Sequence, residues 1–209
     1  GLRCCLTQML DVGVLHGDPA SNLIRTPNAE LAFVDFGMVA TIPSSNMYAM
    51  VSGILHLMNH NYTRLAEDLT TIARLQSQAY DMDYSKLAAE LSSIFEPIMT
   101  SESGFTLIGL AEQLLNLSSR YPLILPSYVI NNIRAMAVLE ELAQSVDPSF
   151  RISNVIYPAV IRKVFFDPAP EMRSALEELV LENSVSVRWD VLELILMRAS
   201  RVQEANRRE

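Results

Sequence analysis

The spacing of apolar residues along the chain predicts a mainly helical protein. From residue 44 onward, apolar side chains recur at intervals of three and four residues, which places them on one face of an α-helix. Prolines and small polar residues divide this pattern into separate segments. We therefore expect helices over residues 44–58, 61–73, 84–99, 106–121, 126–146, 154–166, 170–182 and 188–206.

The first part of the chain shows a different pattern. An amphipathic segment opens it, and Gly13 is placed to end that segment as a helix. Two short apolar runs follow at residues 23–26 and 31–34, with the turn sequence Pro27-Asn28-Ala29 between them. This arrangement predicts one short β-hairpin packed against a helical body, with no strands after Ile42.

The composition agrees with a folded protein of 209 residues, because half of the residues are hydrophobic and only 19% are charged. The net charge of −8 argues against a nucleic-acid-binding surface. The longest apolar run, residues 47–58, is too short to cross a bilayer, so we expect any membrane contact to be peripheral. We divide the chain into a small α/β part over residues 1–43 and a helical remainder over residues 44–209.

Residues with catalytic and metal-binding chemistry flank the predicted hairpin. Asp18 and Asn22 precede its first strand, and Asp35 directly follows its second. Kinase folds place their groups in this order: the first Asp orients or deprotonates the acceptor, while the Asn and the Asp of the Asp-Phe-Gly motif hold Mg²⁺ against the phosphates of ATP. We therefore predict Asp18 as catalytic and Asn22 and Asp35 as ligands of Mg²⁺-ATP. His16 and Gly37 are predicted to have structural roles beside them.

Other parts of a kinase site are missing from the sequence. A glycine-rich phosphate loop, a Lys on an upstream strand and a Glu on the next helix complete such a site. The seven glycines are scattered, and no G-x-G-x-x-G occurs. We expect the chain to be the C-terminal lobe and tail of a larger α+β protein, to lack the N-terminal lobe and to be inactive alone.

Two segments around the candidate residues resemble signature sequences of the UbiB family, the aarF-domain atypical kinase-like proteins. Asp11–Pro19 is similar to the family's H-A-D-P-H-P-G-N segment, in which proline follows the catalytic Asp, and Leu31–Met38 is similar to its L-A-Y-L-D-F-G-M segment. Further similar segments follow, the last of them like that of cyanobacterial and plastid members: Tyr121-Pro122, Arg134-Ala135-Met136, Leu139-Glu140, Asp147–Phe150, Asp167-Pro168, Pro170–Arg173 and Arg188-Trp189.

This resemblance implies a protein-kinase-like C-terminal lobe with one short hairpin and a helical extension. It implies that the full-length protein transfers the phosphoryl group of Mg²⁺-ATP or hydrolyses it. The family's role in isoprenoid-quinone and lipid metabolism suggests isoprenoid lipids or quinone-pathway proteins as partners. The location would be a plastid, a mitochondrion or the surface of a bacterial cytoplasmic membrane.

The loop between Asp18 and Asn22 departs from the family pattern. It holds three residues, where the family has four, and it lacks the family's His and Gly. Three interpretations stay open: a tightened loop that still functions, an imperfect gene model, or a degenerate site. In the last case the protein would be a pseudokinase that serves as a lipid- or protein-binding scaffold.

A second pair of candidate ligands is His56 and His60, which lie one helical turn apart. That spacing permits zinc binding, but the segment lacks the Glu of H-E-x-x-H, and no third ligand is evident. The interpretation that we favour is ordinary core or surface histidines.

Overall fold

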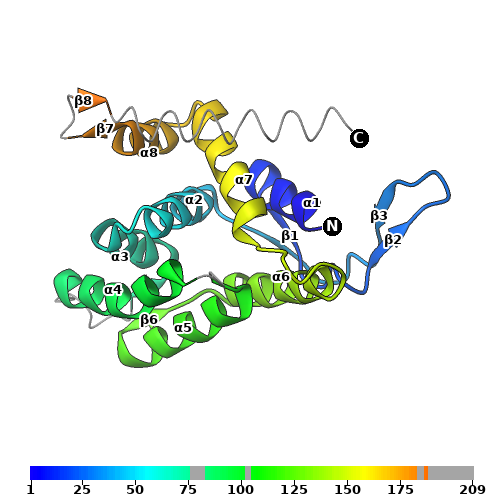
Figure 1. Cartoon of the computed structure of the whole chain (residues 1–209), viewed down its shortest axis with the longest axis horizontal. Helices are drawn as coiled ribbons and strands as arrows, with labels where there is room; N and C mark the ends of the chain where they lie inside the picture. Colours follow the sequence, from blue (N-terminus) through cyan, green and yellow to red (C-terminus); the bar gives the residue numbers. More distant parts are fainter. Residues whose placement is uncertain (76–82, 102–104, 183–185, 188–209) are drawn as a thin grey trace.

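The computed structural model describes residues 1–75, 83–101, 105–182 and 186–187 (Figure 1). The helix expected over residues 188–206 lies outside these residues. The other expected helices form, with bounds that differ by a few residues from those predicted. The helices are α1 Leu2–Thr7, α2 Ser44–Met58, α3 Tyr62–Ile72, α4 Tyr84–Thr100, α5 Leu107–Arg120, α6 Ser127–Val146, α7 Ser153–Phe166 and α8 Pro170–Val180.

Side-chain caps explain where several helices begin. Asn61 accepts a hydrogen bond from the backbone amide of Arg64 (3.2 Å), and Asp83 accepts one from Lys86 (3.1 Å). These bonds satisfy amides that have no partner within the first turn of a helix. Polar residues at such positions therefore identified the starts of α3 and α4 in the sequence.

The start of α5 has two caps: the hydroxyl of Thr106 accepts a hydrogen bond from the amide of Gly109 (3.2 Å), and the second cap comes from another helix. Glu140 of α6 is 3% exposed, and its Oε2 accepts a hydrogen bond from the backbone amide of Leu107 (2.8 Å). Its other carboxylate oxygen, Oε1, has no hydrogen-bond partner within the described residues. Burial raises the pKa of the Glu140 carboxyl, and the bond from Leu107 opposes this rise only in part.

The predicted β-hairpin is confirmed. Strand β2 (Leu23–Arg25) pairs antiparallel with β3 (Leu31–Phe33). Only its base packs against the helical body, through Leu23 and Phe33, and its tip projects away from the helices (Figure 1). The hairpin therefore contacts that body at its base.

A second antiparallel pair carries this hairpin. Strand β1 (Val14–His16) pairs with β4 (Val39–Thr41), so the chain before and after the hairpin lies side by side. Gly13, with φ of 72°, ends the preceding π-helical turn Gln8–Val12 and starts β1. Gly17 comes so close to β4 that a Cβ atom there would lie 2.9 Å from the carbonyl oxygen of Met38, so only glycine fits.

The expectation of no strands after Ile42 was wrong. Arg74–Leu75 (β5) pairs with Leu123–Ile124 (β6), and Leu181–Glu182 (β7) pairs with Ser186–Val187 (β8). Each strand has two residues, which is too short to produce the alternating pattern that identifies a strand in sequence. Because Leu181 and Glu182 form β7, α8 ends at Val180, two residues before the predicted end.

One hydrophobic core extends through both parts of the chain. Leu6 and Leu10 belong to the same buried cluster as Val160 and Val164 of α7, and none of the four is more than 1% exposed. Helix α7 lies beside α1 (Figure 1), and an ion pair of 2.6 Å joins Asp11 to Arg162. In the part of the chain that the structure describes, no helix is both long and apolar enough to cross a membrane.

Candidate active site

The shortened loop after β1 closes as a single turn. The side-chain amide of Asn22 donates a hydrogen bond to the backbone carbonyl of Asp18 (2.9 Å). The same Nδ2 lies 3.3 Å from Oδ2 of the Asp18 carboxylate. Because the amide nitrogen is engaged in this way, the Oδ1 atom of Asn22 remains to bind a cation, and an amide oxygen is a ligand that Mg²⁺ accepts.

His16 joins this loop to the segment after the hairpin. Its ring is buried, Nδ1 accepts from the backbone amide of Asp18 (3.2 Å), and Nε2 donates to the carbonyl of Val34 (3.0 Å). These two partners fit a neutral ring with its proton on Nε2. The ring centroid of Phe36 lies 5.6 Å from that of His16. His16 therefore positions Asp18 and the residue before Asp35 relative to each other.

Asp35 has an unusual backbone conformation. Its φ of 57° lies in the left-handed region, which Asp tolerates better than most residues. Its Oδ1 accepts a hydrogen bond from the backbone amide of Gly37 (3.2 Å), and a Cβ atom on Gly37 would lie 3.1 Å from that oxygen. The tight turn Asp35-Phe36-Gly37 therefore fixes the direction of the Asp35 carboxylate.

Backbone pairing connects the two candidate Mg²⁺ ligands. The amide of Val34 donates to the carbonyl of Asn22 (3.0 Å). Val34, which pairs with Asn22, is the residue directly before Asp35. Hydrogen bonds thus join His16, Asp18 and Asn22, whereas Asp35 is connected to them through Val34. No sequence pattern could have indicated the carbonyl of Val34, because a backbone carbonyl is present at every position.

The donor set fits Mg²⁺ better than zinc or another softer metal. Asn22 and Asp35 offer oxygen atoms, and Mg²⁺ commonly takes one or two such protein ligands while phosphates and water complete its octahedron. Among the residues with described positions, no group of three or more His, Cys, Asp or Glu side chains could hold a metal ion. The oxygen atoms of Asn22 and Asp35 therefore fit a Mg²⁺ ion that takes its other ligands from elsewhere.

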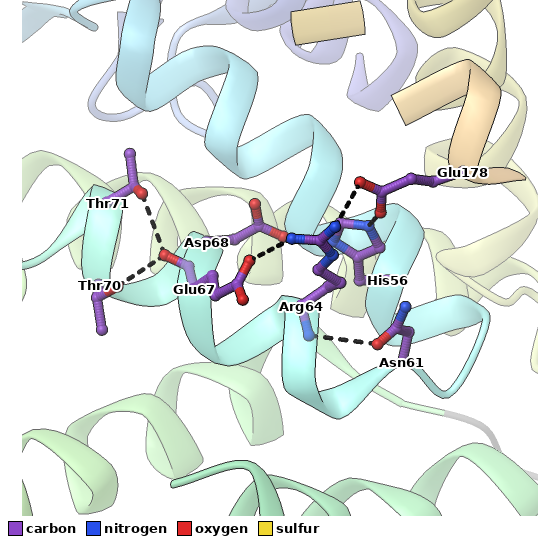
Figure 2. A network of polar contacts seen from close by, with 8 residues as sticks. All are labelled: His56, Asn61, Arg64, Glu67, Asp68, Thr70, Thr71 and Glu178. Atoms are coloured by element: carbon purple, nitrogen blue, oxygen red, sulfur yellow. Dashed lines mark hydrogen bonds and ion pairs between the residues drawn. The ribbon is translucent and has the colours of Figure 1, made fainter. Parts of the chain in front are cut away.

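His56 and His60 lie in separate polar networks. His56 is buried and lies 2.6 Å from Asp68 through Nδ1, whereas His60 is partly exposed and lies 3.0 Å from Glu96. Figure 2 shows His56 of α2 directed toward α3 and α8, with Arg64 and Glu178 beside it. The zinc interpretation gains no support from this arrangement.

Together, the loop, hairpin and Asp-Phe-Gly turn define the class of protein as kinase-like. Residues 1–69 match the family described as the ABC1 atypical kinase-like domain. The chain belongs to this family, which includes the UbiB proteins. No solved structure matches the chain.

Similar proteins come from plants and bacteria. The chain is 33% identical over 205 residues to the Arabidopsis thaliana protein ACTIVITY OF BC1 COMPLEX KINASE 3, chloroplastic, covering 96% of this chain and 28% of that protein. It is 30% identical over 201 residues to an uncharacterized protein of Synechocystis, covering 95% and 29%. It is 27% identical over 189 residues to the probable protein kinase UbiB of Xylella fastidiosa, covering 86% and 33%. The chain thus spans about a third or less of the length of these relatives.

Proposed function

We propose that the full-length protein binds Mg²⁺-ATP and transfers or hydrolyses its terminal phosphoryl group. The observation that carries this proposal is the bonded arrangement of His16, Asp18 and Asn22 on one loop, with Asp35 fixed in a tight turn across the hairpin. These are the residue types that phosphoryl transfer requires, in the order in which kinase folds place them.

In this mechanism each side chain has a distinct task. Asn22 Oδ1 and the Asp35 carboxylate would hold Mg²⁺, which when bound neutralises charge on the phosphates. The Asp18 carboxylate would orient the hydroxyl or water that attacks, and accept its proton. His16 would keep Asp18 in place through the bond from its backbone amide. Catalysis would rest on positioning and electrostatics, because the protein forms no covalent bond to the phosphoryl group.

The shortened loop favours a second candidate function, that of a pseudokinase scaffold. The amide of Asn22 lies close to a carboxylate oxygen of Asp18, so this oxygen is partly engaged before any acceptor arrives. A residue spans roughly 3.3–3.6 Å of extended chain, whereas catalytic groups tolerate errors of only about 0.5 Å. In this alternative the helical part binds a lipid or a protein partner, and nucleotide turnover is lost.

For the biological role, we propose support of isoprenoid-quinone or lipid metabolism at a membrane surface, in a plastid or a bacterium. Relatives described as chloroplastic, cyanobacterial relatives and a UbiB protein support this proposal. The partners would be ATP and either an isoprenoid lipid or proteins of the quinone pathway, with peripheral membrane contact.

Titration of Mg²⁺-ATP into variants of the full-length protein tests the function. We expect Asp35→Ala to abolish Mg²⁺-dependent binding, and Asp18→Ala to retain binding but lose turnover. Glu30→Ala is the matched control, because Glu30 is an exposed acidic residue at the tip of the same hairpin. Unchanged binding in Asp35→Ala would show that the motif is a relic, and the scaffold function would replace the catalytic one.

A further inference from the structure

His56 faces carboxylates on two different helices. Its Nδ1 lies 2.6 Å from Oδ2 of Asp68 on α3, and its Nε2 lies 3.3 Å from Oε2 of Glu178 on α8 (Figure 2). A neutral imidazole carries one N–H and can donate to only one of them. A protonated ring carries an N–H on each nitrogen and a positive charge, so it can donate to Asp68 and attract Glu178 at the same time.

The loss of that proton would affect the contact between Nε2 and Glu178. It is buried and has no aligned hydrogen-bond partner within the described residues, although Glu178 lies nearby. If Nδ1 keeps the only proton to donate to Asp68, the lone pair of Nε2 faces the Glu178 carboxylate. Two electron-rich atoms then lie 3.3 Å apart beside a buried ring, which disfavours this contact.

The charges around His56 are unbalanced without its proton. Asp68 and Glu67 on α3 and Glu178 on α8 are acidic, and Arg64 is the cation among them, at 2.7 Å from Glu67 and 3.1 Å from Glu178. With the imidazolium present, two cations face these three carboxylates. With the neutral ring, Arg64 is the one cation that faces them among the described residues. Burial raises the pKa of the Asp68 carboxyl, and the hydrogen bond and charge of His56 oppose this rise in part. This effect agrees with an electrostatic interaction between His56 and Asp68.

Neighbouring charges on the other helices are engaged elsewhere. On α7, Lys163 pairs with Asp167 (2.6 Å), and Arg162 pairs with Asp11 near the start of the chain. On α4, Glu96 pairs with His60. The charges that face His56 within the described residues are therefore those of α3 and α8.

We propose that protonation of His56 acts as a pH-sensitive latch that holds α8 against α2 and α3. Glu178 of α8 makes ion pairs with these helices. Met172 and Leu179, on the apolar face of α8, are buried. At lower pH the imidazolium bridges Asp68 and Glu178, and α8 is firmly docked. As pH rises through the range in which histidines lose their proton, the bridge to Glu178 becomes repulsive and α8 loosens.

Hydrogen exchange of the full chain tests the latch. Backbone amides of α8 are followed between about pH 6 and pH 8, after correction for intrinsic exchange rates, with those of α5 as an internal reference. We expect the protection of α8 to fall by about tenfold over this range while that of α5 stays constant. His56→Gln should remove the pH dependence, whereas His60→Gln, which changes the histidine just beyond the end of α2, should retain it.

The surface variant Glu178→Gln keeps the test decisive if His56→Gln does not fold, because the Glu178 side chain is 37% exposed. We expect α8 in this variant to exchange independently of pH over the same range. Equal protection of α8 at both pH values in the unaltered protein would overturn the proposal, and so would a pH dependence that persists in Glu178→Gln.

Discussion

The amide of Asn22 donates to the backbone carbonyl of Asp18, which closes the loop that carries both residues. We expect Asn22→Ala to lower the free energy of unfolding by about 0.5–1.5 kcal/mol, because this hydrogen bond is lost. The same change should weaken Mg²⁺-dependent nucleotide binding in the full-length protein. Urea unfolding and ATP titration measure the two effects. Asn28→Ala, in the exposed turn of the hairpin, should change neither.

Residues 1–209 alone should not turn over ATP. The sequence holds no glycine-rich loop, and kinase folds take much of their contact with the nucleotide from that loop and its neighbouring Lys. Phosphate release from the purified chain in the presence of Mg²⁺-ATP checks this expectation. Sustained release that disappears in Asp35→Ala would contradict it.

The left-handed conformation of Asp35 predicts an order among its substitutions. Asp35→Val should destabilise the protein by about 1–2 kcal/mol, because a β-branched residue is strained at a φ of 57°. Asp35→Asn should keep the fold, since Asn also tolerates this conformation, and should lose most Mg²⁺-dependent nucleotide binding. Thermal unfolding separates these effects. Ala29→Gly provides a control, because Ala29 has a φ of 64° in the hairpin turn and should become more stable with glycine. Equal stability of the Val and Asn variants would argue against strain at Asp35.

Glu140 should make the stability of the protein depend on pH. Burial raises the pKa of this carboxyl, so the folded state binds its proton more tightly than the unfolded state does. The contribution of Glu140 to stability is therefore full below the ordinary carboxyl range and declines as pH rises through the raised value. Glu140→Gln, which can still accept from Leu107, should flatten this part of the profile.

Denaturant unfolding at a series of pH values provides the measurement for Glu140. Glu140→Ala leaves the Leu107 amide without its acceptor and should cost about 1–3 kcal/mol below the ordinary carboxyl range, and less as the pH rises. An unaltered pH profile in Glu140→Gln would mean that other groups govern it.

The sequence predicted what depends on local pattern. Apolar spacing and capping residues such as Asn61 and Asp83 located the helices, and the turn sequence around Pro27 located the hairpin. The pairing of β1 with β4 was not predictable in this way, because each strand has three residues and its partner lies beyond the whole hairpin. Residue types also suggested the metal ligands, which stay a prediction.

Contacts between distant residues account for most of what the sequence did not indicate. The closure of the shortened loop depends on a side-chain amide meeting a backbone carbonyl, and the position of His56 depends on Glu178, which lies on a helix far along the chain. No periodicity marks such pairs. The spacing of His56 and His60 gave no information about their partners, and α2 ends at Met58, before His60.

The packing of α7 on α1 has a consequence for synthesis on the ribosome. Arg162 and its partner Asp11 are 151 residues apart in the sequence. At a translation rate of about 5–20 residues per second, the nascent chain waits roughly 8–30 s between the emergence of the two. During that interval Leu6 and Leu10, which are buried in the finished protein, lack the part of their burial that α7 provides. The segment with the candidate active site is therefore made early but completes its folding late. A chaperone that holds unfolded chains would act during this interval.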